Sequence, residues 1–190
     1  AVGDSVLVAV ASALSEHLGE QGNVARIGGE EFMILLPDCD EFCATDKAEK
    51  LKEIIEDLSP SGLRVTASFG VTQLRPEDNY DMIFSRADMA MYEAKSQGKN
   101  RAQFFSDEIN RKIRASLHVE AELRDALTGD NEGLYVAYQP QVCAQSRKII
   151  GFEALTRWTL PDGKSVSPAE FIPVAEKSGL IVDLGTWLIQ

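Results

Sequence analysis

The sequence predicts an α/β protein in which helices and strands alternate along the chain. Apolar residues recur at helical spacing in three segments, residues 5–18, 42–58 and 80–97. Short apolar runs surround a glycine pair at 24–27 and 32–36, and residues 63–72 are rich in Val, Thr and Phe, which favours strands. Such alternation is typical of a sheet covered by helices. A hydrophobic content of 44% with 26% charged residues suits a globular chain with a core.

The first half contains the predicted helices, a hairpin and a strand. Helix 5–18 carries an apolar stripe and is followed by two glycines, and the runs around Gly28-Gly29 predict a β-hairpin with a glycine turn. Helix 42–58 stops before Pro60, and Leu63–Thr72 is the next predicted strand. Gly98 provides the stop signal of helix 80–97, whose inward residues are Ile83, Ala87, Ala90, Met91 and Ala94.

Residues 106–128 predict an amphipathic helix with the apolar stripe Ile109, Ile113, Leu117, Leu123 and Leu127. This helix is either a spacer between two domains or a helix packed on its own domain. Beyond it we predict strands at 135–142 and 149–158. A helix then starts at Ser167-Pro168 and ends at Gly179, because Ser is a good N-cap and Pro suits the first helical position; a last helix begins near Val182.

The charge and the rare residues exclude several classes of protein. A net charge of -11 argues against binding a nucleic acid polymer through a broad basic face. The three cysteines, Cys39, Cys43 and Cys143, predict reduced thiols in a cytosolic protein. No apolar run reaches the roughly 18–20 residues of a membrane helix, and we see no signal peptide.

Two consecutive carboxylates follow the glycine pair in Arg26-Ile27-Gly28-Gly29-Glu30-Glu31-Phe32. Glycines at a hairpin tip let a ligand approach the backbone closely, and alternation along a strand would direct Glu30 and Glu31 to opposite faces. Carboxylates are hard oxygen donors that suit Mg²⁺ bridged to nucleotide phosphates. The alternative is a plain hairpin with two solvated glutamates.

A second motif, Glu153-Ala154-Leu155-Thr156-Arg157-Trp158, lies on a predicted strand. The strand period of two puts Glu153, Leu155 and Arg157 on one face, and Phe152, Ala154 and Trp158 on the face suited to packing under helices. An acid and a base on the same face of a mostly apolar strand must be solvated, paired with each other or used on a ligand. The functional interpretation is a metal-binding carboxylate beside a phosphate-binding guanidinium.

In context, the first motif resembles the GGDEF family. RIGGEEF is followed by ASFGV at 67–71 and RADMAMYEAKSQGKN at 86–100, in the family's order. The resemblance implies a palm-like sheet domain that condenses two GTP into cyclic di-GMP with Mg²⁺. It also implies that Glu30 binds the metal, with Glu31 as a second catalytic candidate, and that the GTP site is formed by Asp4, Leu7, Gly28, Gly29, Lys95 and Lys99.

Two departures from the family pattern limit this expectation. The family's first metal-binding Asp and a guanine-binding Asn fall upstream of Asp4, so we expect the 190 residues to lack them. The positions of the family's inhibitory Arg-x-x-Asp motif hold Gly19, Glu20, Gln21 and Gly22. We therefore predict no inhibitory product site of that type.

The second half resembles the start of an EAL domain, through YQPQV at 138–142, GFEALTRW at 151–158 and SPAEFIPVAEKSGLI at 167–181. That family folds as a TIM-like barrel and hydrolyses cyclic di-GMP with Mg²⁺ or Mn²⁺. The resemblance implies that Glu153 binds the metal and that Gln139, Leu155 and Arg157 contact cyclic di-GMP. A complete barrel takes about 250 residues, so we expect only its opening strands and helices here.

Together, these resemblances predict a GGDEF domain at 1–105, a helical linker at 106–133 and an EAL domain at 134–190, with both domains incomplete. We expect the whole protein to make or degrade cyclic di-GMP, or both, in control of biofilm formation or motility, and the 190 residues alone to be inactive. The alternative is a regulatory module that senses GTP or cyclic di-GMP without turnover. We further expect a homodimer in the cytoplasm, either free or as part of a membrane-anchored sensor.

Overall fold

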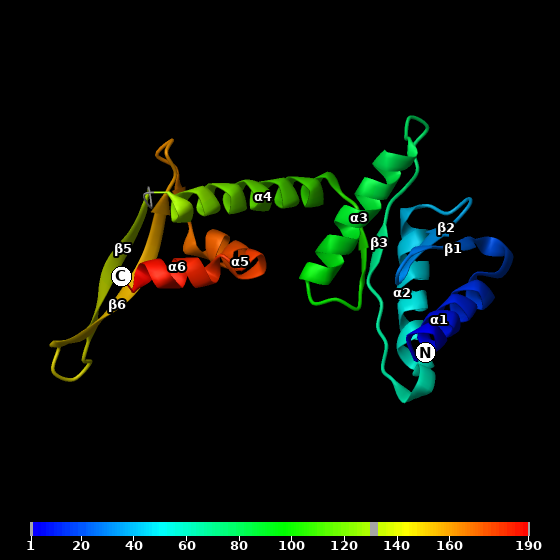
Figure 1. Ribbon diagram of the computed structural model, residues 1–190, viewed down its shortest axis with the longest axis horizontal. Coiled ribbons are helices and arrows are strands. Elements are labelled where there is room, and N and C mark those ends of the chain that lie inside the picture. Colours follow the sequence, from blue (N-terminus) through cyan, green and yellow to red (C-terminus); the bar gives the residue numbers. More distant parts are fainter. Residues whose placement is uncertain (1, 130–132, 190) are drawn as a thin grey trace. The chain divides into compact units, whose positions relative to one another are not determined.

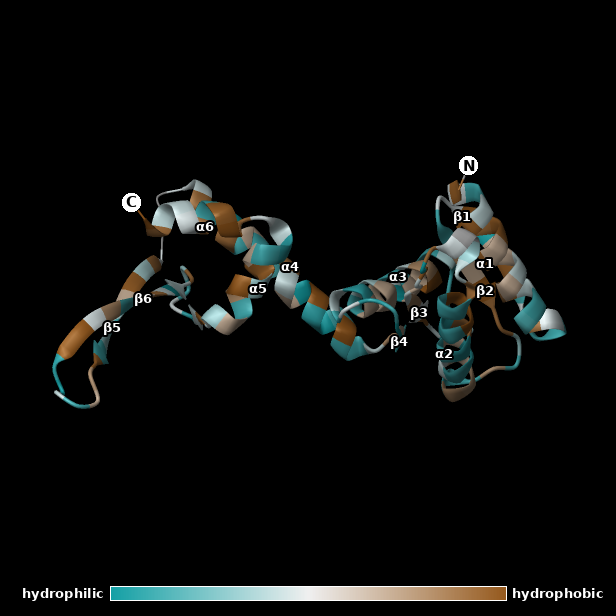
Figure 2. Ribbon diagram, turned by 90° about the horizontal axis from the view of Figure 1, so that it is seen from below, coloured by the Kyte–Doolittle hydropathy of each residue, from teal (hydrophilic) through white to brown (hydrophobic). Residues whose placement is uncertain are grey.

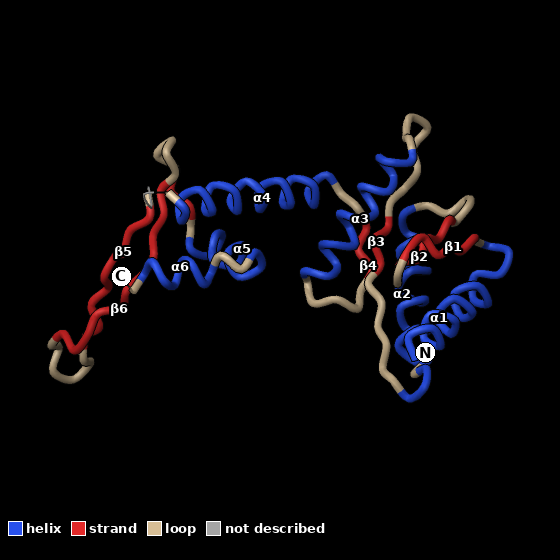
Figure 3. Tube along the Cα trace, viewed as in Figure 1, coloured by secondary structure: helices blue, strands red, loops and turns tan. Residues whose placement is uncertain are grey.

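The computed structural model describes residues 2–129 and 133–189, and the chain divides into two compact units at Arg111 and Lys112. Each unit combines helices with short sheets, so the predicted α/β class is confirmed (Figure 1 and Figure 3). In the described part of the chain, no helix is both long and apolar enough to cross a membrane.

In the first unit, two helices and a hairpin form one core. Helix α1 (Val2–Leu18) and a 3₁₀ turn, η1 (Gly19–Gln21), lead into strands β1 (Asn23–Gly28) and β2 (Glu31–Leu35), and then helix α2 (Glu41–Leu58) follows. The buried residues come from the apolar stripes of the two helices: Val10, Leu14, Leu18, Leu51 and Ile55. Phe32 and Ile34 of β2 pack against them. Both predicted helices and the predicted hairpin are therefore confirmed.

A second sheet in this unit pairs β3 (Phe69–Val71) with β4 (Ala102–Phe104) in parallel, and helix α3 (Tyr80–Ser96) packs on it. Gly70 permits this packing, because an added Cβ would lie 2.0 Å from the Ala87 carbonyl oxygen. The predicted strand 63–72 is wrong outside 69–71. Its partner β4 is only three residues long, and a second 3₁₀ turn, η2 (Pro60–Gly62), and an unpaired stretch precede β3.

The prediction of three reduced thiols is also wrong, because Cys39 and Cys43 form a disulfide. Asp40 is the N-cap of α2 and accepts a hydrogen bond from the Cys43 backbone N–H at 2.8 Å. This capping turn brings the two Cα atoms to 5.5 Å, within the range that a disulfide spans. Cys143 remains a free thiol.

The second unit is built on an antiparallel sheet of β5 (Leu134–Val142), β6 (Ile149–Thr159) and β7 (Ser165–Val166). Helix α4 (Asp107–Thr128) runs into this unit, and α5 (Pro168–Ser178) and α6 (Ile181–Leu188) complete it. Its core contains residues from all these helices and strands: Val119, Leu123, Leu134, Trp158, Val166, Phe171, Ala175, Leu180 and Leu184.

Two details of the second unit differ from the predicted pattern. On α4, Leu117 is 59% exposed, whereas Val119 is buried and takes a place in the core. On β6, Trp158 packs edge-on against Phe171 under the helices, but Phe152 on the same face is 62% exposed. The outer half of the β5–β6 hairpin therefore carries apolar residues that the described residues leave uncovered (Figure 2).

Candidate functional site

The glycine pair forms the tip of the β1–β2 hairpin. Gly28 pairs with Glu31 across the strands, so Gly29 and Glu30 form a two-residue turn. Gly29 has a φ of 42°, in the left-handed region that glycine adopts without a steric cost. The register shifts between Arg26 and Gly28, which places a bulge immediately before the tip.

Arg26 holds this tip closed. Its Nε and Nη2 atoms donate hydrogen bonds to the Gly29 carbonyl oxygen at 2.9 and 2.6 Å. A guanidinium fork that spans from strand to turn fixes the path of the backbone around the glycine pair. The sequence motif alone does not predict this role of Arg26. The signal for it is a long side chain with several N–H donors three residues before the turn carbonyl.

The two carboxylates lie at different places from those that simple alternation predicts. Glu30 belongs to the turn, and only Glu31 begins a strand. The prediction that they point to opposite faces of one strand is therefore wrong for Glu30. Both side chains are exposed, and in the described part of the chain neither carboxylate has a hydrogen-bond or ion-pair partner. Both are accessible to a ligand at the tip.

Asp4 and Leu7 lie near the start of α1, which packs against β1. Strand β1 runs back beside α1 after the 3₁₀ turn (Figure 1). From Asp4 to Leu18 the helix rises about 21 Å, and β1 from Asn23 to Gly28 covers about 17 Å. The start of α1 and the glycine tip therefore lie toward the same end of this layer, as a shared nucleotide site requires.

Lys95 and Lys99 lie in another part of the first unit. Lys95 is in the last turn of α3, and Lys99 follows Gly98 with a φ of 62°. Both side chains are exposed. Helix α3 packs on β3 and β4, and α2 contacts both of these strands and α1. The structure thus holds the two lysines and the hairpin in one unit, on different elements.

An ion pair that sequence reasoning missed anchors the start of α3. Arg86 pairs with Asp78, whose side chain is 1% exposed, and Asp78 also accepts a hydrogen bond from the Arg75 backbone N–H at 2.6 Å. Burial raises the pKa of Asp78, but the Arg75 N–H and the Arg86 guanidinium outweigh burial and lower the pKa overall. Asp78 is therefore a carboxylate at neutral pH.

In the second unit, the sheet register brings the predicted residues onto one face. Gln139 pairs directly with Glu153, and Ala137 pairs with Leu155, so the side chains of each pair lie on the same side of the hairpin. Arg157 is on this side too, because it lies four residues after Glu153 on β6. Glu153 and Gln139 are exposed. The predicted common face is confirmed by this register.

The alternative of an internal Glu153–Arg157 pair is not realised among the described residues. Four residues of strand separate the two Cα atoms by about 13 Å. Arg157 donates from Nη1 to the Thr156 carbonyl oxygen at 3.2 Å, and Glu153 has no ion-pair partner in the described part of the chain. Both charged groups are therefore available to a ligand on this face.

The donor set at each motif suits a hard divalent cation only in part. Glu30 and Glu153 supply carboxylate oxygens, which Mg²⁺ prefers. However, no three His, Cys, Asp or Glu side chains gather into a metal-binding group within residues 2–129 and 133–189. Glu30 and Glu31 at the hairpin, and Glu153 on the second motif, do not complete such a site by themselves, so we derive no catalytic step through a metal.

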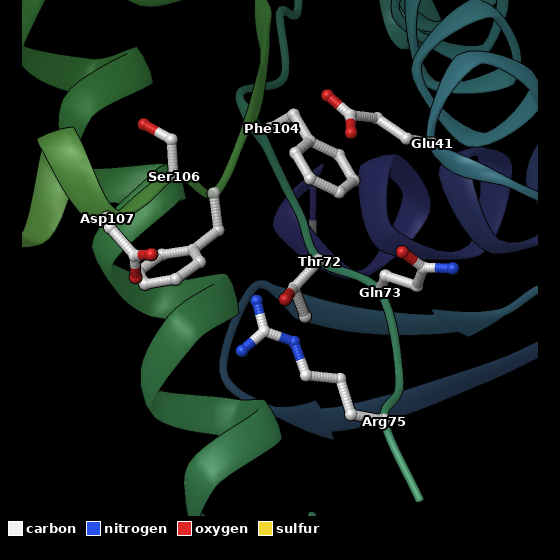
Figure 4. A pocket seen from close by; sticks show the side chains of 8 residues that line it. Glu41, Thr72, Gln73, Arg75, Phe104, Ser106 and Asp107 are labelled. Carbon is white, nitrogen blue, oxygen red and sulfur yellow. The ribbon is translucent and has the colours of Figure 1, made fainter.

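A cavity of about 260 Å³ lies elsewhere in the first unit, near the carboxyl ends of β3 and β4 (Figure 4). It is lined by acidic, basic and aromatic side chains, among them Glu41, Arg75, Phe104 and Asp107. None of the residues that the motifs predict lines it. The candidate site therefore remains the exposed hairpin tip with its neighbouring residues.

Comparison with known proteins gives two family matches. The model described as "Diguanylate cyclase, GGDEF domain" matches residues 1–101, and the model described as "EAL domain" matches residues 120–190.

Several curated relatives match the whole chain, among them MucR and YkoW. The bifunctional diguanylate cyclase/cyclic di-GMP phosphodiesterase MucR of Pseudomonas aeruginosa is 37% identical over 194 residues, which cover 100% of this chain and 28% of the relative. The signaling protein YkoW of Bacillus subtilis is 37% identical over 198 residues, which cover 100% of this chain and 24% of the relative. The chain thus spans about a quarter of the length of these relatives.

A solved structure, described as PaMucR phosphodiesterase in complex with c-di-GMP, is 42% identical. The match covers 37% of this chain and 28% of that one, with a TM-score of 0.34.

Proposed function

The chain belongs to the diguanylate cyclase GGDEF family, and from this we propose that the whole protein turns over cyclic di-GMP. In one reaction, two GTP condense to cyclic di-GMP with release of two pyrophosphates, and the GGEEF hairpin contributes to that site. In a separate reaction, the EAL face contributes to hydrolysis of cyclic di-GMP to the linear dinucleotide. The single observation that carries the proposal is the exposed hairpin tip, which Arg26 holds by hydrogen bonds to the Gly29 carbonyl oxygen. In the described part of the chain, the carboxylates of Glu30 and Glu31 beside Gly28-Gly29 have no partner there.

At the hairpin, each residue has a distinct proposed role. The Gly28-Gly29 backbone permits close approach of the nucleotide, and Arg26 keeps the tip in one conformation. Glu30 supplies oxygen donors for a divalent cation, which would neutralise phosphate charge when bound, and Glu31 is the second catalytic candidate. Asp4 and Leu7 hold the guanine, by hydrogen bonding and by apolar contact.

Two lysines, Lys95 at the end of α3 and Lys99 in the turn after it, complete the proposed GTP site. Lys95 and Lys99 bind the triphosphate as point charges. Their exposure lets them reach a ligand, and their chain is otherwise acidic, with a net charge of -11, so phosphate attraction has to be local.

On the EAL face, Glu153 is the proposed metal-binding carboxylate, and Gln139 and Leu155 contact cyclic di-GMP. Arg157 pairs with a phosphate of the ligand. The common face of β5 and β6 supports this set of roles. Relatives of this chain are described as cyclic di-GMP phosphodiesterases, alone or together with cyclase activity.

A second candidate function is a module that binds GTP or cyclic di-GMP without turnover. One observation favours it for the 190 residues taken alone: in the described residues, no group of three or more metal-binding side chains exists. We therefore propose that the GGDEF part (1–105), the helical linker (106–133) and the EAL part (134–190) need the rest of the protein for activity. We also propose that the whole protein is a homodimer and that it is located in the cytoplasm.

Paired substitutions in the whole protein test these assignments. Glu30→Ala is expected to abolish synthesis of cyclic di-GMP while hydrolysis continues, and Glu153→Ala is expected to have the opposite effect. Glu53→Ala, an exposed glutamate on α2, serves as the matched control. Both rates are measured by chromatography of the nucleotide products. If both substitutions left both rates unchanged, the site assignments would be wrong.

A further inference from the structure

The turn that joins α3 to β4 has an unusual backbone. Gly98, Lys99 and Asn100 follow one another with φ values of 112°, 62° and 47°. The Lys99 N–H donates to the Ala94 carbonyl oxygen at 3.1 Å, which closes the end of α3. Glycine adopts positive φ readily and asparagine tolerates it, whereas lysine rarely does. Surrounding contacts must therefore hold Lys99 in this conformation.

Helix α2 supplies those contacts from one face. Glu56 Oε2 accepts a hydrogen bond from Asn100 Nδ2 at 2.9 Å, and Glu49 Oε1 accepts one from the Ala102 backbone N–H at 2.9 Å. Residues 49 and 56 are seven apart, so they lie on the same side of the helix. The two carboxylates thus reach the turn on either side of residue 101.

Each of these carboxylates also pairs with a cation through its other oxygen. Glu56 Oε1 pairs with Arg64, and Glu49 Oε2 lies 2.8 Å from Lys52 Nζ. The Asn100 amide, and then Arg64, lower the pKa of Glu56. Each cation binds one oxygen of its glutamate and leaves the other oxygen to accept a hydrogen bond from the turn. The hydrogen bond from Asn100 Nδ2 therefore has a charged acceptor at neutral pH.

The far end of the turn is held by the sheet. The Phe69 N–H donates to the Arg101 carbonyl oxygen at 2.9 Å, and β4 pairs with β3 from Ala102 onward. Two side-chain hydrogen bonds hold the stretch between these fixed ends: Arg101 Nη1 donates to Gln97 Oε1 at 2.9 Å across the turn, and the Glu56–Asn100 bond ties a residue of the left-handed pair itself to α2.

We propose that Glu56 is a positioning residue for GTP binding: it holds Asn100, and through it fixes the backbone that presents Lys99 to the triphosphate. This inference rests on the proposed role of Lys99 in the GTP site. Glu56 itself does not touch the nucleotide. Without the Glu56 carboxylate, Lys99 and Asn100 can adopt ordinary backbone conformations. The backbone position from which the Lys99 side chain extends is then no longer fixed.

The test measures binding of α,β-methylene-GTP, in which the bond that breaks is blocked, to the whole protein with Mg²⁺ by calorimetry. Four variants are compared with the unmodified protein: Lys99→Ala, Glu56→Ala, the double variant, and Glu53→Ala as a control on the same helix. Loosening a positioning contact is expected to weaken binding about 5- to 10-fold in Glu56→Ala. The double variant is expected to bind no more weakly than Lys99→Ala, because the two residues act as one unit.

A conservative variant and a folding control keep the result interpretable. Glu56→Gln retains an amide oxygen that accepts from Asn100 and is expected to bind within about twofold of the unmodified protein. Thermal melting followed by circular dichroism checks that each variant is folded. A merely structural Glu56 would give losses that add to that of Lys99→Ala, and that additivity would overturn the proposal.

The outcomes also separate this inference from the proposed function. If Lys99→Ala weakens binding and Glu56→Ala does not, the positioning role is wrong and the GTP site stands. If Lys99→Ala itself has no effect, the phosphate role of Lys99 is wrong and the positioning role is overturned with it.

Discussion

Replacing Gly70 by alanine tests how closely β3 packs on α3. An alanine Cβ would lie 2.0 Å from the Ala87 carbonyl oxygen and 2.5 Å from the Met91 nitrogen. Both are backbone atoms of a helix and have no rotamer with which to move away. Since ordinary contact begins near 3.4 Å, the strand and helix must separate by more than 1 Å to admit the methyl group.

The cost follows from overpacking. Forcing extra atoms into a packed interface costs about 1–3 kcal/mol. At about 2 kcal/mol, local opening becomes roughly 30-fold more frequent, since 1.4 kcal/mol is a factor of ten. We expect the amides of β3 and of α3 around residues 87–91 to exchange with deuterium faster by this factor in the whole protein, as measured by mass spectrometry.

Gly185→Ala is the matched control. This glycine lies inside α6, and an added Cβ has no neighbour within 4 Å. Alanine is favoured over glycine within a helix by about 0.5–1 kcal/mol, so the control is expected to leave exchange in α6 unchanged or slower. Unchanged exchange at β3 and α3 in Gly70→Ala would refute the close packing.

Two further predictions concern charge and thiols. Because the pKa of Asp78 is lowered in the folded state, the stability that the Asp78–Arg86 pair contributes is fully present above the ordinary aspartate pKa of about 3.9 and is lost as the pH falls through the lower folded value. The stability difference between the unmodified protein and Asp78→Asn, followed by urea unfolding, is therefore expected to be constant from pH 7 to about pH 4 and to shrink below it; a difference already lost at pH 6 would contradict this. In the unreduced, denatured 190-residue chain, iodoacetamide is expected to label only Cys143, and after reduction it labels Cys39 and Cys43 as well; three labels without reduction would exclude the disulfide.

Local signals predicted the parts of the fold that depend on local chemistry. The hairpin follows from a glycine pair between apolar runs, and the helix after Ser167 follows from its N-cap, which accepts a hydrogen bond from the Ala169 N–H. The common face of Glu153, Leu155 and Arg157 follows from the strand period alone. These features need no knowledge of distant residues.

The parts that sequence reasoning missed depend on partners far along the chain. Residues 63–68 have strand-forming composition, but β-propensity acts only where a neighbouring strand exists. Val119 joins the core of the second unit together with Leu134 and Trp158, which lie far along the chain, whereas Leu117 is exposed. The Glu56–Asn100 bond joins residues 44 positions apart, and no local pattern points to it.

The candidate site was predicted in composition but not in all its geometry. The motif identified Glu30 and Glu31, yet the turn length decides that only Glu31 begins a strand. The bulge before Gly28 and the hydrogen bonds from Arg26 to the Gly29 carbonyl oxygen determine the shape of that turn. Both depend on the pairing of the two strands.

A single analysis of reaction products shows whether the whole protein turns over cyclic di-GMP. The whole protein is incubated with Mg²⁺, GTP and isotope-labelled cyclic di-GMP together, and the products are separated by mass. We expect unlabelled cyclic di-GMP from a working GGEEF site, labelled linear dinucleotide from a working EAL site, or both. If a folded protein formed neither product, turnover would be excluded and the chain would belong to a module that only binds these nucleotides.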